Sequence, residues 1–181
     1  MNNGHQIILN YADLAPVLKR IRAKRQKIVL TQGSWDMLHV GHARYLEEAK
    51  KYGDVLIVGT DSDVKIRQRK GPGRPVVPQE ERLEMLTYIR SVDYVVLKPE
   101  VAEKYSLIKL IKPDVLIVIK ENYTENQLKD LAKFCGEVQV LPRMATTSTS
   151  AKLRSVQIGQ TKKIESKLLR AIDQVLAEYR D

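Results

Sequence analysis

The sequence predicts an α/β fold, a doubly wound five-stranded parallel sheet with helices on both faces. Two observations predict it. Short β-branched runs recur along the chain and are apolar throughout, as in strands that are buried on both faces. Segments with apolar residues three or four positions apart separate these runs, as in amphipathic helices. Because crossovers between parallel strands are right-handed, this alternation indicates a doubly wound sheet, whose ligands bind at the carboxyl ends of the strands.

Five strands are expected, and three of the loops at their carboxyl ends are candidate ligand sites. The strands are "KIVLTQ" (27–32), "DVLIVGT" (54–60), "DYVVLK" (93–98), "DVLIVI" (114–119) and "EVQVLP" (137–142). The loops of interest after them are 32–41, 60–63 with 69–78, and 142–150.

Helical patterns fill the intervals between the strands. In "VGHARYLEEAKKY" (40–52), Val40, Ala43, Leu46 and Ala49 form one apolar stripe, and similar stripes predict helices within 78–91, 103–112 and 124–135. An N-terminal helix is expected at 11–24 and a C-terminal amphipathic helix at 161–180. No stretch has the composition of a linker, so we expect one domain, 1–181, with its core at about 27–154.

The amino-acid composition is typical of a globular protein of a reducing compartment. The 181 residues are 43% hydrophobic, enough for a sizeable core. The single cysteine, Cys135, favours a reducing compartment, and the absence of a signal-like or membrane-spanning run favours the cytoplasm. The net charge of +9 favours phosphorylated or polyanionic partners. Basic residues cluster at 19–27, on the polar face of a helix, and at 65–74, in a Gly/Pro loop.

The first loop carries "GSWDMLHVGH" (33–42). Gly33 is expected to let the chain turn sharply and approach a ligand, and the amides at the helix start near Val40 form a natural seat for phosphate. His39 and His42 lie three positions apart and project to the same side of that helix, where both imidazoles can donate to phosphate oxygens. Helix capping is the plainer reading of the pair. A zinc site lacks further ligands, because the chain has three histidines and one cysteine.

The other two loops are also compatible with phosphate binding. "RKGPGRPVVP" (69–78) offers Lys70 and Arg74 on a glycine-rich turn, although a solvated turn would explain it nearly as well. Ser148, Thr149 and Ser150 open a late helix, where they could cap the helix or bind phosphate. No P-loop motif is present, which excludes a P-loop kinase.

The motif of the first loop (33–42) and the hydroxyl run (148–150), in this order along the chain, resemble motifs of the cytidylyltransferase-like nucleotidylyltransferase superfamily. "GSWDMLHVGH" matches its Gly-Thr-Phe-Asp-x-x-His-x-Gly-His, and "STS" (148–150) matches its Ser-Thr-Thr. Within the superfamily, "KGPGRPVVPQEERLEML" and "SVDYVVL" are very similar to the adenylyltransferase domain of ADP-heptose synthase, with a likeness from about residue 8 to 154. The resemblance implies a Rossmann-like fold of the HIGH-motif nucleotidyltransferase type.

The resemblance also implies roles for single residues. It implies that His39 and His42 bind the triphosphate and stabilise the transition state, and that Lys70 and Arg82 contact phosphates of the nucleotide or the acceptor. The remaining nucleotide-binding positions that it implies are Gly33, Ser34, Trp35, Asp36, Gly41, Arg143, Ser148, Thr149 and Ser150. No protein side chain is expected to bind a metal directly.

The implied activity is transfer of a nucleoside monophosphate, AMP from ATP, to a phosphorylated small molecule such as a heptose 1-phosphate. Mg²⁺ would accompany the nucleotide, pyrophosphate would leave, and the enzyme would be a cytoplasmic homodimer that binds neither membrane nor nucleic acid. An alternative is a cytidylyltransferase that uses CTP and glycerol 3-phosphate. A third reading, from another class, is a non-catalytic nucleotide sensor or nucleic-acid-binding protein.

Two positions depart from the family pattern. Trp35 replaces the usual phenylalanine. After the fourth strand, "KENY" (120–123) stands where the family has Gly-Gly-Asp-Tyr or Gly-Asp-Asp-Trp, so the acceptor could differ from heptose 1-phosphate.

Overall fold

A computed structural model describes residues 6–144, 164 and 167–169. The chain divides into two units, residues 1–145 and 146–181, and the fold below is that of the first. In the second unit, residues 164 and 167–169 are helical, as the expected helix 161–180 requires, and the rest of that helix lies outside the described residues. The organisation of 1–181 as one domain stays a prediction.

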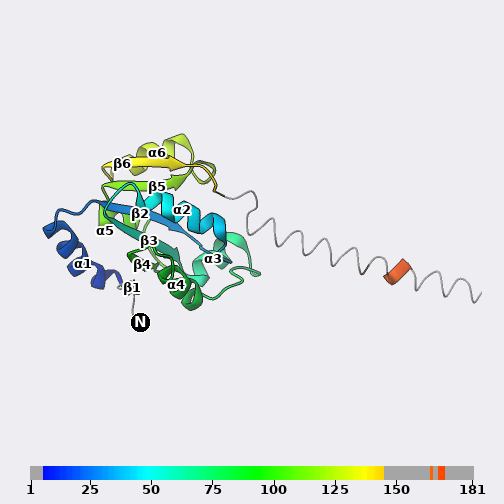
Figure 1. Ribbon diagram of the computed structural model, residues 1–181. Helices are drawn as coiled ribbons and strands as arrows, with labels where there is room; N and C mark the ends of the chain where they lie inside the picture. Colours follow the sequence, from blue (N-terminus) through cyan, green and yellow to red (C-terminus); the bar gives the residue numbers. More distant parts are fainter. Residues whose placement is uncertain (1–5, 145–163, 165–166, 170–181) are drawn as a thin grey trace, which may run out of the picture. The chain divides into compact units, whose positions relative to one another are not determined.

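A parallel sheet forms the centre of the first unit (Figure 1). Within the described residues it has six strands in the order β1-β4-β3-β2-β5-β6, and every neighbouring pair is parallel. The predicted α/β class is therefore confirmed. The strands are β1 Gln6–Ile8, β2 Ile28–Gly33, β3 Val55–Asp61, β4 Tyr94–Lys98, β5 Val115–Ile119 and β6 Glu137–Leu141.

The expected count of five strands misses β1. This strand has only three residues and lies at the edge of the sheet, where it pairs with β4 from Gln6 opposite Tyr94 to Ile8 opposite Val96. Three residues are too few to show an apolar pattern, and the edge position comes from backbone pairing with a strand that lies far along the chain.

Six α-helices and one 3₁₀ turn connect these strands in the described part of the chain. They are α1 Tyr11–Ala23, α2 Val40–Lys50, α3 Asp63–Lys70, α4 Gln79–Thr87, α5 Ser106–Ile111, the 3₁₀ turn Lys120–Asn122 and α6 Glu125–Ala132. The helix α3 corrects the expected loop, because most of the basic cluster at 65–74 is helical. Ser62 caps this helix by accepting from the amide of Lys65, and Ile66 anchors it as a fully buried residue.

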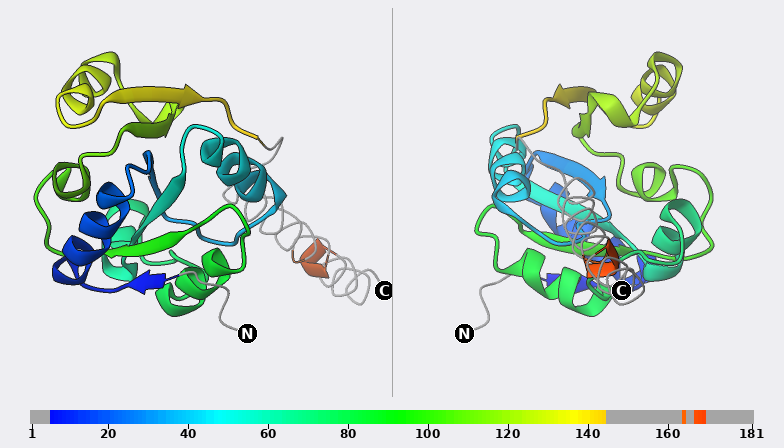
Figure 2. Two further views of the ribbon diagram at one scale, coloured as in Figure 1. Left: turned by 60° about the vertical axis from the view of Figure 1, so that its left-hand side comes forward. Right: turned by 90° about the vertical axis from the view of Figure 1, so that its right-hand side faces the viewer.

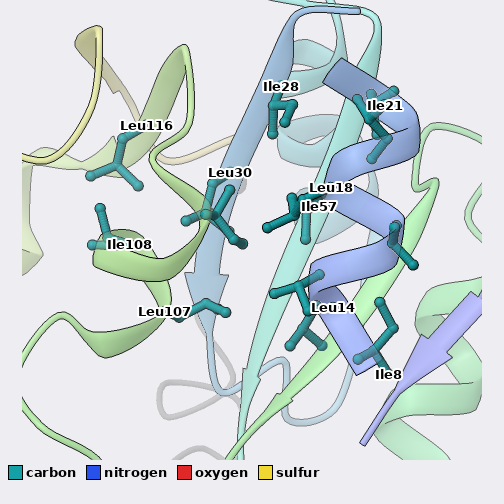
Figure 3. Packing of buried hydrophobic residues seen from close by; sticks show 14 of the residues in the cluster. Ile8, Leu14, Leu18, Ile21, Ile28, Leu30, Ile57, Leu107, Ile108 and Leu116 are labelled. Carbon is teal, nitrogen blue, oxygen red and sulfur yellow. The ribbon is translucent and has the colours of Figure 1, made fainter. Parts of the chain in front are cut away.

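The two faces of the sheet carry separate cores, because neighbouring residues of a strand point to opposite faces. On one face Leu30 and Ile57 pack against α1 and α5, and Figure 3 shows Leu14, Leu18 and Ile21 of α1 over these strands. On the other face Val29, Leu56 and Val58 pack against α2 and α4. Figure 2 shows the helices on both sides of the sheet. This double cover is the doubly wound arrangement that the sequence predicts.

The strand order reverses between β2 and β5. The chain moves outward from β2 to β3 and β4, then returns to place β5 on the other side of β2. Open α/β sheets bind ligands in the crevice at such a switch point, outside the carboxyl ends of the strands. The loop 34–39 after β2 and the 3₁₀ turn after β5 flank this point.

Candidate active site at the carboxyl end of the sheet

The loop after β2 is buried and tightly constrained. Ser34, Trp35 and Asp36 are 8%, 6% and 4% exposed. The sharp turn comes from Trp35 and Met37, which have left-handed φ angles of 53° and 50°. Residues other than glycine rarely adopt left-handed φ angles, and residues strained in this way cluster at functional sites. At Gly33, the last residue of β2, a Cβ would lie 3.1 Å from Cε2 of the Trp35 ring, so the glycine makes room for the indole, and its expected approach to a ligand stays a prediction.

Trp35 holds the loop against the sheet. Its indole Nε1 donates to the carbonyl of Gly59 on β3 at 3.0 Å, a bond that phenylalanine could not make. The ring also meets the His42 ring edge-on, with centroids 5.7 Å apart, and packs at a tilt against Tyr45. The departure from the family phenylalanine therefore adds a hydrogen bond and keeps the aromatic contact with the helix.

Asp36 connects this loop to the glycine-rich loop after α3. Its carboxylate accepts hydrogen bonds from the amides of Val76 and Val77, at 3.0 to 3.2 Å. Arg74 Nε lies 3.1 Å from Oδ2 of the same carboxylate. Asp36 therefore ties the loop after β2 to the glycine-rich loop, and Arg74 is engaged with its carboxylate.

The two histidines cap α2 with their rings. His39 Nδ1 accepts from the amide of Gly41 at 3.1 Å, and His42 Nδ1 accepts from the amide of His39 at 3.3 Å. The rings lie face to face with a tilt, their centroids 4.1 Å apart. A nitrogen that accepts cannot carry the proton of a neutral imidazole, so these contacts place the N–H of each ring on Nε2. The expected amide seat is modified, since two of those amides donate to the rings.

Arg82 lies beneath the site rather than on its surface. Its side chain is 1% exposed and donates to the carbonyls of Ser34, Val77 and Asp61. It also pairs with the Asp63 carboxylate at 2.7 Å. The guanidinium therefore ties together the loop after β2, the glycine-rich loop and the end of β3.

Lys70 ends α3 and borders the glycine-rich loop. Partial desolvation lowers its pKa, and the positive charges of Arg69 and Arg74 lower it further. An ammonium among other cations is a favourable partner for phosphate.

At the far side of the switch point, Arg143 Nε lies 3.8 Å from the carboxylate of Glu121, in the "KENY" turn. Ser148, Thr149 and Ser150 lie outside the described residues.

Three further residues join this edge of the sheet and were not singled out from the sequence. Asp61 ends β3 with 1% exposure, and its carboxylate accepts from Lys98 Nζ at 2.8 Å and from Arg69 Nη2 at 2.9 Å. The only sign of this cluster in the local sequence was Asp61 itself, an acidic residue directly after an expected buried strand. Its partners lie 8 and 37 positions along the chain, so only the strand pairing of Asp61 with Lys98 reveals the cluster.

The described residues include no group of three or more histidine, cysteine, aspartate or glutamate side chains placed to hold a metal. No helix among them is long and apolar enough to cross a bilayer.

Comparison with known proteins identifies the family. The model of the family described as "Cytidylyltransferase-like" matches residues 30–165, well over half of the chain. Among relatives, the bifunctional protein HldE of Wolinella succinogenes is 40% identical over 152 residues, which are 83% of this chain and 31% of that protein. The HldE of Nitratiruptor sp. is 36% identical over 152 residues, 83% of this chain and 32% of that protein. The chain thus spans about a third of the length of these relatives.

Solved structures agree with the fold. A lipopolysaccharide core biosynthesis protein from Thermoplasma volcanium superposes with a TM-score of 0.56 at 28% identity, covering 65% of this chain and 96% of that one. A pantoate-beta-alanine ligase from Francisella tularensis, at 18% identity and a TM-score of 0.59, covers 81% of this chain and 69% of that one and shows the fold alone. The match to the family model and the relatives confirm the resemblance seen in the sequence: the chain belongs to the cytidylyltransferase-like family of nucleotidyltransferases.

Proposed function

We propose that the protein transfers AMP from ATP to a heptose 1-phosphate and releases pyrophosphate. The observation that carries this proposal is the histidine pair at the start of α2, whose Nδ1 atoms both accept from backbone amides. The resemblance to the adenylyltransferase domain of ADP-heptose synthase and the similarity to HldE proteins support ATP and a heptose phosphate as the substrates.

The chemistry needs charge stabilisation more than proton transfer. An oxygen of the acceptor phosphate attacks the α-phosphorus of the nucleotide in line and forms a new P–O bond. The bond from the α-phosphorus to the bridging oxygen breaks, and pyrophosphate leaves with the electron pair. Because the nucleophile is already an anion, no general base is required, and catalysis consists of positioning and preorganised donors.

The contacts of each side chain indicate its role in positioning the substrates and stabilising charge. The histidines present Nε2–H donors of fixed tautomer to the triphosphate, since their Nδ1 atoms are held by the amides. Lys70 contributes positive charge near the glycine-rich loop. Arg82 supports the loop of Ser34 from below, through hydrogen bonds to backbone carbonyls.

We expect Mg²⁺ to enter with the triphosphate, where it would neutralise phosphate charge. The homodimer and the cytoplasmic location expected from the sequence stay predictions. Sedimentation of the purified chain would test the first.

The experiment that tests the proposal separates phosphate binding from helix capping. In His39→Asn and His42→Asn, the asparagine carbonyl can replace Nδ1 as an acceptor near the backbone, whereas nothing replaces the distant Nε2–H. We expect each variant to retain wild-type unfolding stability within about 1 kcal/mol, because asparagine is a favoured residue at the N-cap position 39, and at position 42 its side-chain oxygen lies as many bonds from the backbone as Nδ1 does. Turnover should fall by about 100- to 1,000-fold, as when other preorganised donors are removed.

Turnover is measured as pyrophosphate release with Mg²⁺, each nucleoside triphosphate in turn, and heptose 1-phosphate or glycerol 3-phosphate. Release with ATP and heptose 1-phosphate supports the proposal, and preference for CTP and glycerol 3-phosphate would replace it with the cytidylyltransferase alternative. Wild-type turnover in both asparagine variants would refute the role of the histidines. No turnover with any pair of substrates would refute the enzymatic function.

A further inference from the structure

A buried carboxylate organises the cations at the carboxyl ends of β3 and β4. Asp61 is 1% exposed, and its two oxygens accept from different cations, Lys98 and Arg69. Burial of Asp61 disfavours its charged form, but Lys98, Arg69 and Lys65 outweigh this and hold its pKa below the ordinary value. The carboxylate is therefore ionised at neutral pH, and it fixes the positions of its partners.

Arg69 is held by this carboxylate while it faces solvent. Its Nη2 donates to Asp61 at 2.9 Å and to Ser34 Oγ at 2.8 Å, although 55% of the side chain is exposed. An exposed arginine ordinarily loses considerable side-chain entropy when it binds a ligand. Here the two contacts have already restricted the guanidinium, and within the described residues its Nε and Nη1 make no hydrogen bond. It is a preorganised donor next to the loop after β2, to which Ser34 belongs.

The cluster carries surplus positive charge. Lys65, Arg69 and Lys98 contribute three charges and Asp61 removes one, which leaves a net charge of +2. Partial burial of Lys65 lowers its pKa, and the charges of Lys98 and Arg69 lower it further. The surplus matches a phosphate monoester dianion, and a guanidinium suits such an anion because its donors form a planar fork.

The position of the cluster assigns it to the second substrate. The histidines cap the helix that follows β2, beside the switch point where nucleotides bind in such sheets. Asp61 and Lys98 lie on β3 and β4, further along the sheet, and Arg69 reaches back to Ser34 from there. A phosphate bound by Arg69 would thus lie next to the loop after β2 without competing for the start of α2.

We propose that Arg69, oriented by Asp61 and Ser34, binds the phosphate of the acceptor, and that Lys65 and Lys98 complete a site for a phosphate monoester dianion. This inference rests on the proposed function, which requires a phosphorylated acceptor. Arg69 is the group that contacts substrate, Asp61 is a positioning residue, and Lys65 and Lys98 supply the remaining positive charge of the site.

The test compares Arg69→Met with Arg67→Met. Both residues are exposed on α3 and both changes remove one positive charge, but no side-chain hydrogen bond or ion pair is found for Arg67 among the described residues. Pyrophosphate release is followed with ATP and heptose 1-phosphate. We expect Arg69→Met to raise the KM for the acceptor by about 10- to 100-fold, the loss of a charged hydrogen bond, with the KM for ATP unchanged within about twofold. Arg67→Met should change neither KM by more than about twofold.

A second measurement does not depend on turnover. Binding of inorganic phosphate to the full chain is followed by phosphorus NMR while an ATP analogue with a methylene bridge between the α- and β-phosphorus fills the nucleotide site. Arg69→Met should weaken this binding at least about tenfold, and Arg69→Lys should weaken it less because the charge remains. Melting temperatures of all variants verify that they are folded.

The outcomes separate this inference from the proposed function. Wild-type turnover together with an unchanged acceptor KM in Arg69→Met would overturn the inference and leave the function standing. Absence of wild-type turnover together with phosphate binding that needs Arg69 but not Arg67 would overturn the function and keep the anion site. Equal phosphate binding by the Arg69→Met and Arg67→Met proteins would overturn the inference in either case.

Discussion

Replacing Arg82 with methionine should destabilise the protein strongly, because the arginine joins three segments inside the molecule. Methionine keeps much of the side-chain volume and removes the guanidinium. Three carbonyls then lose a donor, those of Ser34 and Asp61 in a buried environment and that of Val77 in a partly buried one. The Asp63 carboxylate, 19% exposed, also loses its partner at 2.7 Å.

The expected loss of unfolding free energy follows from these lost contacts. Removing one member of a buried ion pair costs roughly 3–5 kcal/mol, because the remaining charge and polar groups are left uncompensated. In a chain of this size each kcal/mol lowers the melting temperature by about 2–4 °C, so Arg82→Met should melt about 6–20 °C below wild type. Since natural domains are stable by about 5–15 kcal/mol, the variant should still fold at low temperature.

The assay is urea unfolding followed by circular dichroism, with Arg90→Met as the matched control. Arg90 is exposed just beyond the same helix, α4, and its replacement should change the free energy of unfolding by less than about 0.5 kcal/mol. An Arg82→Met midpoint equal to that of Arg90→Met would refute the reasoning, since the hydrogen bonds of the guanidinium would then contribute nothing measurable to stability.

Two further predictions concern acid sensitivity and backbone crowding. Because the pKa of folded Asp61 lies below its ordinary value of 3.8, ionised Asp61 stabilises the fold above about pH 4, and this contribution is lost as the pH falls through the folded pKa. Urea titrations should therefore show Asp61→Asn less stable than wild type by a constant amount between about pH 5 and 7, a difference that shrinks below about pH 4; a difference independent of pH would contradict the ion cluster. Gly53→Ala places a Cβ 2.7 Å from Val29 Cγ2 and 2.8 Å from the Lys27 carbonyl, whereas Gly73→Ala meets nothing within 4 Å. The first should lower the free energy of unfolding by about 1–3 kcal/mol and the second by less than about 0.5 kcal/mol, and equal thermal melting of the two variants would show that the backbone at Gly53 yields easily.

Local patterns were enough to predict the layers of the fold. Uninterrupted apolar strands and amphipathic helices report burial directly, so the α/β class and five of the strands follow from residues close together in the chain. The same holds for the start of α2, where the spacing of His39 and His42 places both side chains on one side of the helix. The family motifs lie in these locally determined segments, which is why the resemblance could be recognised.

Other features were decided only by the tertiary structure. The strand β1 exists because β4 pairs with it, and α3 exists because a cap and one buried isoleucine outweigh a run of charged residues. Trp35 and Met37 adopt left-handed φ angles although neither is glycine, and the Trp35 indole is held by a hydrogen bond to Gly59. Arg82 gives no sign in the sequence of being buried.

The sequence by itself determined which residues could bind phosphate at the carboxyl end of the sheet, because strand and helix periods place those residues at loop starts. Only the tertiary structure decided how these residues divide the work. Hydrogen bonds across 21 to 48 positions turn Arg82 inward, and pairing of β3 with β4 brings Lys98 onto Asp61 so that Arg69 is held outward. Charges of the same sign thus acquire different roles, because the free energy of a charge depends on the partners that the fold brings within a few ångströms of it.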